Sequence, residues 1–546
     1  MTTNNNSVPT KNNPSDSPES LRTRLRLLEA GVGLLESREV GSGLVEGAAQ
    51  AIGCPLERAH IYFGRDEDLV LALYLKLNTA LAERVSDLPP TTIAERFAAL
   101  MQWKFAAVAP FRRALRAQLG TLLRARQPMG VLGSQTELVR ITMLGVVATV
   151  VYGASDCPAQ NAEAVAHSLY SVHLALMLLW TRDETPGSKA TLNALRRAGK
   201  LLSPEKSLIP HDAVLAGLTA VDKIVGPLLR AEANSEASRL ANQILKTLFQ
   251  YRRLLPEAGA CAASPCERCF APHLPKLRRA IQAGERLHLL LPAFPAKSPS
   301  PLKTLGTLPD MAEEQALRFL QKICTEITAL YPPGVRLTIC SDGHVFSDLV
   351  GVADADVSLY GTAVRDMIAA QHSDSLETFS MEDLYEGADY AAMRHHLGLH
   401  YAEPLEEIEA RIHAHPQQQT HFNGIHRFLY EDTLGIETEK SKTQLRKEAK
   451  ERAYHVIRRS DAWGRLLAEC FPTALRLSIH PHPPHGDKIG ILLGEADDAW
   501  LTPWHSVAVR LPNGFQLVPR QRAEELGAHL VVVHDRSYYY ELAERS

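Results

Sequence analysis

The sequence has no segment typical of a secretion signal or a membrane span. Residues 1–20 are rich in Asn, Ser and Pro, whereas a signal peptide needs a central apolar segment. The longest uncharged apolar stretch, Met143 to Ala154, is much shorter than the ~20 residues that cross a bilayer. We therefore expect a cytoplasmic protein that does not bind membranes.

Cysteine is scarce, and neither sign of charge dominates. Eight cysteines in 546 residues exclude a small disulfide scaffold. The 59 Lys and Arg residues nearly balance the 62 Asp and Glu residues, for a net charge of −3. This balance excludes a broadly basic nucleic-acid coat protein and an acidic disordered protein. Hydrophobic residues at 45% and charged residues at 22% are typical of a globular chain, and its length suggests about three or four domain-sized units.

The N-terminal part of the sequence predicts a disordered tail followed by short helices. Residues 1–20 have almost nothing apolar to bury and predict the tail. Apolar residues three and four apart then predict an amphipathic helix over 21–35. A second helix at 44–52, a Gly-Cys-Pro turn at 53–55 and a third helix ending near 63 complete the pattern. This order is typical of a helix-turn-helix.

Residues 27–77, with the sequences EGAAQAIGC and HIYFGRDEDLVLALYLKL, resemble the N-terminal domain of TetR-type regulators. The resemblance implies an all-α domain over 21–195 that mediates homodimerisation, followed by a helical connector over 196–240. Residues 21–78 hold seven Lys or Arg and eight Asp or Glu, whereas DNA-binding modules need several cationic phosphate contacts. We therefore expect packing or dimerisation rather than DNA binding. If the domain binds DNA, the contacts are expected from Arg58, His60 and Arg65.

The C-terminal part, 241–546, predicts an α/β domain with a Rossmann-like, mostly parallel sheet. Short β-branched or apolar runs alternate there with helical stretches, which is typical of this class. Asn513-Gly514 separates two such runs and predicts a hairpin, so that the last strands form an antiparallel addition. The expected strands are 286–291, 335–340, 475–480, 489–493, 506–511, 515–519 and 530–534, and the clearest helices are 311–330 and 354–370.

Polar side chains gather where two of these strands end. The strand at 335–340 runs into Ser341–Asp348, and the strand at 475–480 runs into His480–Lys488. Ligands bind at the carboxyl ends of strands in open α/β sheets. Strand alternation also places Arg476 with His480 on one face. Such a polar face needs either a polar ligand or a structural network that satisfies it.

Two metal sites are alternatives at this point. His480 and His482, with Asp342 or His344, offer the two imidazoles and one carboxylate of a non-haem iron oxygenase. Separately, three thiols and an imidazole close together in the sequence suit zinc. These residues are Cys261, Cys266, Cys269 and His273.

Residues of about 245–540 resemble the isocyanide (isonitrile) synthases of the pyoverdine/dityrosine biosynthesis protein family. Several long blocks in family order carry the resemblance. They are 291–317, 331–360, 422–432, 456–483, 486–491 and 501–509.

The resemblance implies an enzyme of natural-product biosynthesis that converts the α-amino group of an amino acid into an isocyanide. It implies that ribulose 5-phosphate supplies the new carbon from C2, through an imine and acid/base fragmentation, with no metal or organic cofactor. The expected partners are therefore two small molecules, the amino acid and the pentulose phosphate. A TetR-type regulator with a metabolite-sensing C-terminal domain is the alternative from a different functional class.

Imine formation and sugar fragmentation need proton donors and acceptors, and the two anionic substrates need fixed cations. We assign proton transfer to Asp342, His344, Asp348 and His480. No metal ligand is assigned. Substrate binding is assigned to Lys297, Arg427, Arg458, Arg459, Arg476, Lys488 and His505.

Overall fold

The computed structural model describes residues 17–35, 43–86, 88–122, 127–158, 160–203, 211–229, 235–255, 258–385, 389–434, 436, 439–494 and 501–542. Most of the expected tail, residues 1–16, lies outside this part of the chain. Pro18 already begins the first helix, so residues 18–20 are helical rather than part of a tail.

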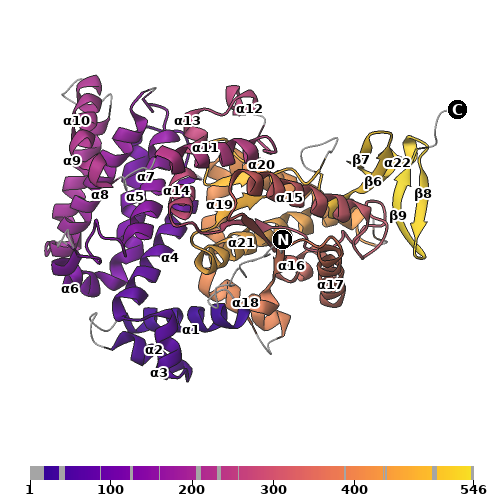
Figure 1. Ribbon diagram of the computed structural model, residues 1–546, viewed down its shortest axis with the longest axis horizontal. Coiled ribbons are helices and arrows are strands. Elements are labelled where there is room, and N and C mark those ends of the chain that lie inside the picture. The colour runs from indigo at the N-terminus through magenta and orange to yellow at the C-terminus, as the bar shows by residue number, and fades with distance from the viewer. Residues whose placement is uncertain are drawn as a thin grey trace, which may run out of the picture.

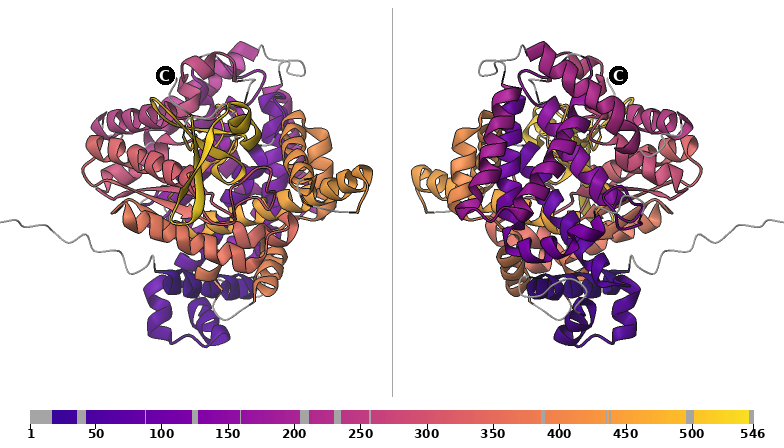
Figure 2. Two further views of the ribbon diagram at one scale, coloured as in Figure 1. Left: turned by 90° about the vertical axis from the view of Figure 1, so that its right-hand side faces the viewer. Right: turned by 90° about the vertical axis from the view of Figure 1, so that its left-hand side faces the viewer.

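Helices make up the N-terminal half of the described chain (Figure 1). The long helices pack side by side, and the first three helices of the chain form a group below them (Figure 2). The helices are α1 (Pro18–Leu35), α2 (Leu44–Ile52), α3 (Leu56–Tyr62), α4 (Asp66–Ser86), α5 (Ile93–Val108), α6 (Arg112–Leu122), α7 (Glu137–Tyr152), α8 (Ala162–Arg182), α9 (Lys189–Leu202), α10 (His211–Leu229) and α11 (Ser235–Phe249), with 3-10 turns η2 (Ala109–Phe111) and η3 (Pro186–Ser188).

The first four helices share a small core. Leu28 of α1, Ala48 of α2, Ala59 of α3 and Leu69 of α4 are buried against one another. The helix-turn-helix order expected from the sequence is therefore present at the expected residues. The likeness to TetR-type regulators stays a prediction, as does a role in dimerisation.

One described helix, α8, is long and apolar enough to cross a membrane by length and composition alone. Its Val165, Leu169 and Leu176 instead pack into the core of the helical half, together with Val147 of α7. The apolar character of α8 is thus accounted for by packing against neighbouring helices.

A five-stranded parallel sheet, in the order β3-β2-β1-β4-β5, forms the centre of the C-terminal half. This confirms the expected mostly parallel α/β fold. Its strands are β1 (Leu287–Pro292), β2 (Val335–Cys340), β3 (Leu376–Phe379), β4 (Leu475–Ser478) and β5 (Lys488–Gly490).

Helices cover both faces of this sheet. Leu289 and Leu337 point into a core made with α11, α14 (Leu274–Gln282), α15 (Met311–Leu330) and α17 (Asp354–Ala370). Leu290 and Cys340 point into a second core on the opposite face. The helices of that face are α16 (Gly343–Val350), α18 (Tyr390–Tyr401), α19 (Leu405–Ala414), α20 (Pro416–Leu434) and α21 (Lys442–Cys470).

A second, four-stranded sheet lies at the far end of the molecule from the N-terminal helices (Figure 1). Its strands β6 (Val507–Leu511) and β7 (Gly514–Val518) form the hairpin expected around Asn513-Gly514 and pair antiparallel. The remaining elements are β8 (His529–Val533), β9 (Arg536–Glu541), α12 (Ala260–Ala263), α13 (Glu267–Phe270), α22 (Arg520–Glu525), η5 (Met381–Asp383) and η6 (Pro503–His505).

Candidate active site

Two cavities meet at the carboxyl edge of the parallel sheet. Asp342, which follows β2, and His480, which follows β4, line both of them. His421 from α20 lines both as well, and its ring centre lies 5.0 Å from that of His480. Sequence analysis missed His421, although it directly precedes one of the blocks that resemble the family. We call Asp342, His421 and His480 the junction.

The smaller cavity, of about 200 Å³, is lined by many charged side chains. We call it the charged chamber. Lys488 lies beside Arg476 on the neighbouring strand, and Arg411 pairs with Asp461 at 2.5 Å. His482 follows His480 into the same chamber.

The larger cavity, of about 670 Å³, has an apolar wall. We call it the wide chamber. Phe346, Val350, Phe428 and Trp504 supply much of this wall, and Arg427 also lines the chamber. The side chain of Arg427 is 63% exposed and pairs with Glu431 of the same helix at 3.7 Å.

Burial raises the pKa of Asp342 to about 7. Its Oδ1 is buried and has no hydrogen-bond partner among the described residues. Glycine at position 343 lets the backbone that follows Asp342 pass close to Pro295. A Cβ atom at this position would lie 1.9 Å from the carbonyl oxygen of Pro295. Asp342 therefore exchanges a proton near neutral pH, which suits a general acid or base.

The histidines of the junction are held neutral. Burial lowers the pKa of His480 well below its ordinary value, and His421 and His482 act in the same direction. Burial likewise lowers the pKa of His421 to about 4, with Lys488 contributing. A neutral imidazole accepts a proton through its unprotonated nitrogen, so these rings are potential bases.

The N-terminal helices contribute a carboxylate to the charged chamber. Glu83 of α4 pairs with Arg476 at 2.7 Å and with Arg465 at 3.2 Å, and lies 3.9 Å from Lys488. Burial by itself would raise the pKa of Glu83, but the cations of Arg476, Lys488 and Arg465 outweigh it and lower the pKa. The sequence offered no signal for this contact, because the partners are distant along the chain.

His344 lines a small cavity beside α17, whereas His480 lines the two chambers. The two rings, both assigned to proton transfer from the sequence, therefore face different cavities. The Nδ1 of His344 lies 3.2 Å from Asp354, its Nε2 lies 3.2 Å from Ser358, and its ring stacks on Tyr390 at 3.8 Å. Both of its nitrogens are therefore engaged by neighbouring side chains.

Four further expected site residues are also held by structural contacts. Lys297 lies at the wall of the wide chamber, and its buried amine pairs with Asp310 at 2.8 Å and Glu313 at 2.7 Å, so its charge is already engaged. The remaining three lie away from both chambers: Arg459 pairs with Asp348, and Arg458 donates to the carbonyl of Glu403 at 2.7 Å.

His505 does line the wide chamber. Its Nδ1 lies 3.0 Å from the Thr502 hydroxyl, and its Nε2 lies 3.7 Å from Asp432. Burial raises the pKa of Asp432, but the hydrogen bond and charge of His505, together with Lys303, lower it to about 2. The chamber thus has a fixed negative charge beside Lys303.

The predicted metal sets differ from the observed geometry. In the described residues, His480 and His482 form no compact ligand group with Asp342 or His344. His273 is buried edge-on to Phe249 and does not join the three cysteines. The imidazole that does join them is His485.

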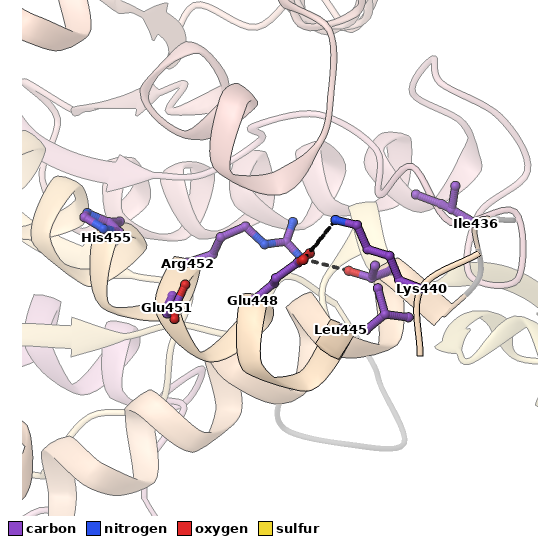
Figure 3. A pocket seen from close by; sticks show the side chains of 8 residues that line it. Ile436, Lys440, Leu445, Glu448, Glu451, Arg452 and His455 are labelled. Atoms are coloured by element: carbon purple, nitrogen blue, oxygen red, sulfur yellow. Dashed lines mark hydrogen bonds and ion pairs between the residues drawn. The ribbon is translucent and has the colours of Figure 1, made fainter. Parts of the chain in front are cut away.

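A further hollow of about 580 Å³ lies beside α21 and the segment that precedes it. Figure 3 shows Lys440 and Glu448 bonded to each other there, at 2.7 Å. None of the junction residues lines it, so it is separate from the candidate active site.

Comparison with known proteins identifies the fold that carries this site. Residues 277–531 match the family model described as "Pyoverdine/dityrosine biosynthesis protein". The L-tryptophan isonitrile synthase AmbI1 of Fischerella ambigua is 43% identical over 306 residues, which cover 56% of this chain and 96% of that protein. The chain belongs to the pyoverdine/dityrosine biosynthesis family. It is an isonitrile (isocyanide) synthase.

Two further comparisons with members of this family give similar identities. The L-tyrosine isonitrile synthase of Pseudomonas aeruginosa is 44% identical over 313 residues, covering 56% of this chain and 95% of that protein. The crystal structure of PvcA from Pseudomonas aeruginosa superposes with a TM-score of 0.54 at 44% identity, covering 56% of this chain and 99% of that chain. The family model begins at residue 277, so most of the helical half, including Glu83, lies outside it.

Proposed function

We propose that this isonitrile synthase joins an aromatic L-amino acid to ribulose 5-phosphate, whose C2 becomes the isonitrile carbon. The observation that carries the proposal is the pair of unlike cavities that meet at Asp342, His421 and His480. A reaction between an amine and a ketone needs two binding regions that share one point, with proton-transfer groups at that point.

The wide chamber suits the amino acid. Its wall of Phe346, Phe428 and Trp504 offers apolar and aromatic surface to a large side chain. The names of two similar enzymes specify L-tryptophan and L-tyrosine as their substrates. We propose Arg427 as a contact for the substrate carboxylate, with Arg253, which also lines the chamber near His480, as a second positive charge.

The charged chamber suits the pentulose phosphate. Lys488 is the best placed cation for the phosphate group, because its side chain is 29% exposed and its nearest carboxylate oxygen, on Glu83, is 3.9 Å away. Arg476 lies in the same chamber but is engaged by Glu83. We therefore assign Arg476 the role of shaping the chamber and Lys488 the role of binding the ligand.

The junction supplies the proton transfers. Neutral His480 accepts the proton of the substrate ammonium, which frees the amine to add to the C2 ketone. Protonated Asp342 then donates a proton to the departing hydroxyl, so that water leaves and a protonated imine forms. The resulting Asp342 carboxylate is positioned to accept a proton when the sugar-derived carbon chain breaks. His421, beside His480, keeps that ring oriented.

The experiment is a two-substrate assay with ribulose 5-phosphate carrying carbon-13 at C2. L-tryptophan, L-tyrosine, L-phenylalanine, L-leucine and L-valine are supplied in turn, and products are trapped with a tetrazine and weighed by mass spectrometry. We expect isonitrile from an aromatic amino acid, with the label in the isonitrile carbon. An unlabelled isonitrile would contradict the carbon source, and a product from leucine or valine alone would contradict the proposed side-chain class.

The helical half supports a second proposal, that residues 21–195 form a domain through which two copies pair. Within this range, α8 exposes two large apolar side chains, Leu178 at 38% and Leu179 at 39%. Light scattering of the full chain is expected to show a dimer, and Leu179→Glu a monomer with unchanged turnover. A monomeric wild-type protein would contradict the pairing.

A further inference from the structure

Three thiols and one imidazole converge outside the proposed active site. The Sγ of Cys266 lies 3.6 Å from that of Cys261 and 3.9 Å from that of Cys269. The Nε2 of His485 lies 3.5 Å from Cys261 Sγ and 3.3 Å from Cys266 Sγ. All four ligand atoms lie within 4.8 Å of one another.

These separations match the edges of a zinc tetrahedron. Bonds of about 2.3 Å to sulfur and about 2.0 Å to nitrogen set edges of about 3.8 Å between two sulfurs and about 3.5 Å between sulfur and nitrogen. We propose that Cys261, Cys266, Cys269 and His485 bind one Zn²⁺ ion. The three thiols bind as thiolates and release their protons, and His485 binds through Nε2.

The donor set and the charge balance favour zinc in a structural role. Three soft thiolates and an imidazole fill four positions, which closes the site to water and substrate. The three thiolates and the ion leave one net negative charge. Arg252 donates a hydrogen bond to the Cys261 carbonyl at 2.8 Å, and its cation lies close enough to Cys269 to stabilise the thiolate.

The backbone beside the cysteines suits a thiolate. The N–H groups of Cys269 and Arg268 hydrogen-bond to the sulfur of Cys266. Backbone N–H groups directed at a sulfur stabilise its thiolate, which is the form that binds metal.

The ion would fix the loop that carries His480 of the junction. His485 belongs to the same loop as His480 and His482, between β4 and β5. The chain that leads to the cysteines already pairs with this loop, since Leu254 bridges to His482 and the N–H of His482 donates to the carbonyl of Arg253. Zinc would add a second tie between the two segments. This role holds whatever reaction the junction performs.

Two alternatives compete with this zinc site: a disulfide between two of the cysteines, and a zinc site with a different histidine. Cys261 and Cys266 are near enough for a disulfide to form after oxidation, with only a small shift of their sulfurs. The other arrangement uses His273, which follows Cys269 closely in the sequence. Its ring is buried elsewhere, against Phe249, so His485 and His273 make a matched pair for testing.

The test uses the full chain, purified under reducing conditions from zinc-supplemented cells without a metal-affinity column. Elemental mass spectrometry is expected to give about one zinc per chain. His485→Gln is expected to hold at least about tenfold less zinc after dialysis against a mild chelator. His273→Gln and Cys54→Ser, whose residues lie outside the cluster, are expected to keep it.

A measurement on the unaltered sequence keeps the test decisive if a variant fails to fold. Replacement of zinc by Co²⁺ is expected to give thiolate-to-cobalt charge-transfer bands and the intense visible bands of a tetrahedral site. A wild-type protein with intact thiols and no zinc overturns the proposal. So does a Cys261–Cys266 disulfide found by peptide mapping of freshly prepared protein, or loss of zinc in His273→Gln together with its retention in His485→Gln.

Discussion

Glu83 of α4 and Arg476 of β4 form an ion pair of 2.7 Å that joins the helical half to the parallel sheet. Both side chains are 10% exposed. The family model matches only the part of the chain that contains Arg476. The charged chamber of this enzyme is therefore completed by a residue from outside the segment that defines its family.

Glu83→Gln is expected to lower the free energy of unfolding by about 3 kcal/mol at pH 7, because it leaves Arg476 buried beside a neutral amide. The pKa of Glu83 is lowered in the folded protein. Its stabilisation is therefore present above its ordinary pKa and is lost as the pH falls through the lowered value. Urea unfolding at pH 7 and near pH 4 measures both effects.

The control for Glu83 is Glu407→Gln. Glu407 also pairs with an arginine, Arg84 at 2.9 Å, but it is 54% exposed, so its loss is expected to change stability by less than about 0.5 kcal/mol. Equal effects of the two substitutions would contradict the importance of the buried pair.

Asp342→Asn is expected to stabilise the fold while it removes activity. The pKa of Asp342 is raised to about 7 when folded, so between about pH 4 and pH 7 the folded state binds a proton that the unfolded state has released. Ionised Asp342 thus costs stability that grows as the pH rises through this window. The variant is expected to exceed the wild type by about 2 kcal/mol at pH 8 and by much less at pH 5.

Urea unfolding of both proteins at the two pH values, beside the isonitrile assay, checks this expectation. A variant that is inactive and less stable at pH 8 would show that the carboxyl is a structural partner rather than a strained functional group.

His480→Gln and His344→Gln separate a junction residue from a positioning residue. Loss of the proton acceptor at His480 is expected to lower kcat by about 100-fold or more, with little change in the unfolding midpoint. Loss of the Asp354 and Ser358 contacts of His344 is expected to cost about 1–3 kcal/mol of stability. We expect kcat of that variant to stay within about threefold of the wild type below its unfolding temperature.

Steady-state kinetics and thermal unfolding of both variants make the comparison. The roles assigned to the two rings would be reversed if His344→Gln lost turnover without loss of stability and His480→Gln did not.

Lys488→Met is expected to raise KM for the pentulose phosphate by about tenfold or more, because it removes the cation that we propose for the phosphate. KM for the amino acid is expected to change little, since we propose the other chamber for that substrate. Lys440→Met is the matched control, because Lys440 pairs with Glu448 in the separate hollow of Figure 3. If only KM for the amino acid rose, Lys488 would bind the amino acid and not the phosphate, which would contradict the assignment.

The sequence predicted the sheet better than the contacts of the site. Runs such as Val335–Cys340 are rich in apolar residues and largely buried, which is typical of strands inside a parallel sheet. The edge strand β3, Leu376–Phe379, was missed because its exposed Glu377 gives it no continuous apolar run. Asp342 and His480 could be placed because they follow strands, and the ends of parallel strands meet at one edge.

Contacts between distant segments could not be predicted in this way. The sequence suggested that Lys297 is available to bind phosphate. Asp310 and Glu313, whose side chains accept backbone hydrogen bonds at the start of α15, also form ion pairs with its amine. His273 looked like a fourth ligand because it is near the cysteines in sequence. His485 takes that place only because the loop after β4 folds back over them. Pairings of this kind depend on the packed fold and leave no local pattern.

The missing side chain at Gly343 sets a limit on how this enzyme can be re-engineered. Any larger residue there would collide with the Pro295 carbonyl and push Asp342 out of register with the two histidines. Libraries that aim to change the accepted amino acid should therefore keep position 343 constant. They should vary Phe346 and Val350 instead, which lie one and two turns further along the same helix and face the wide chamber.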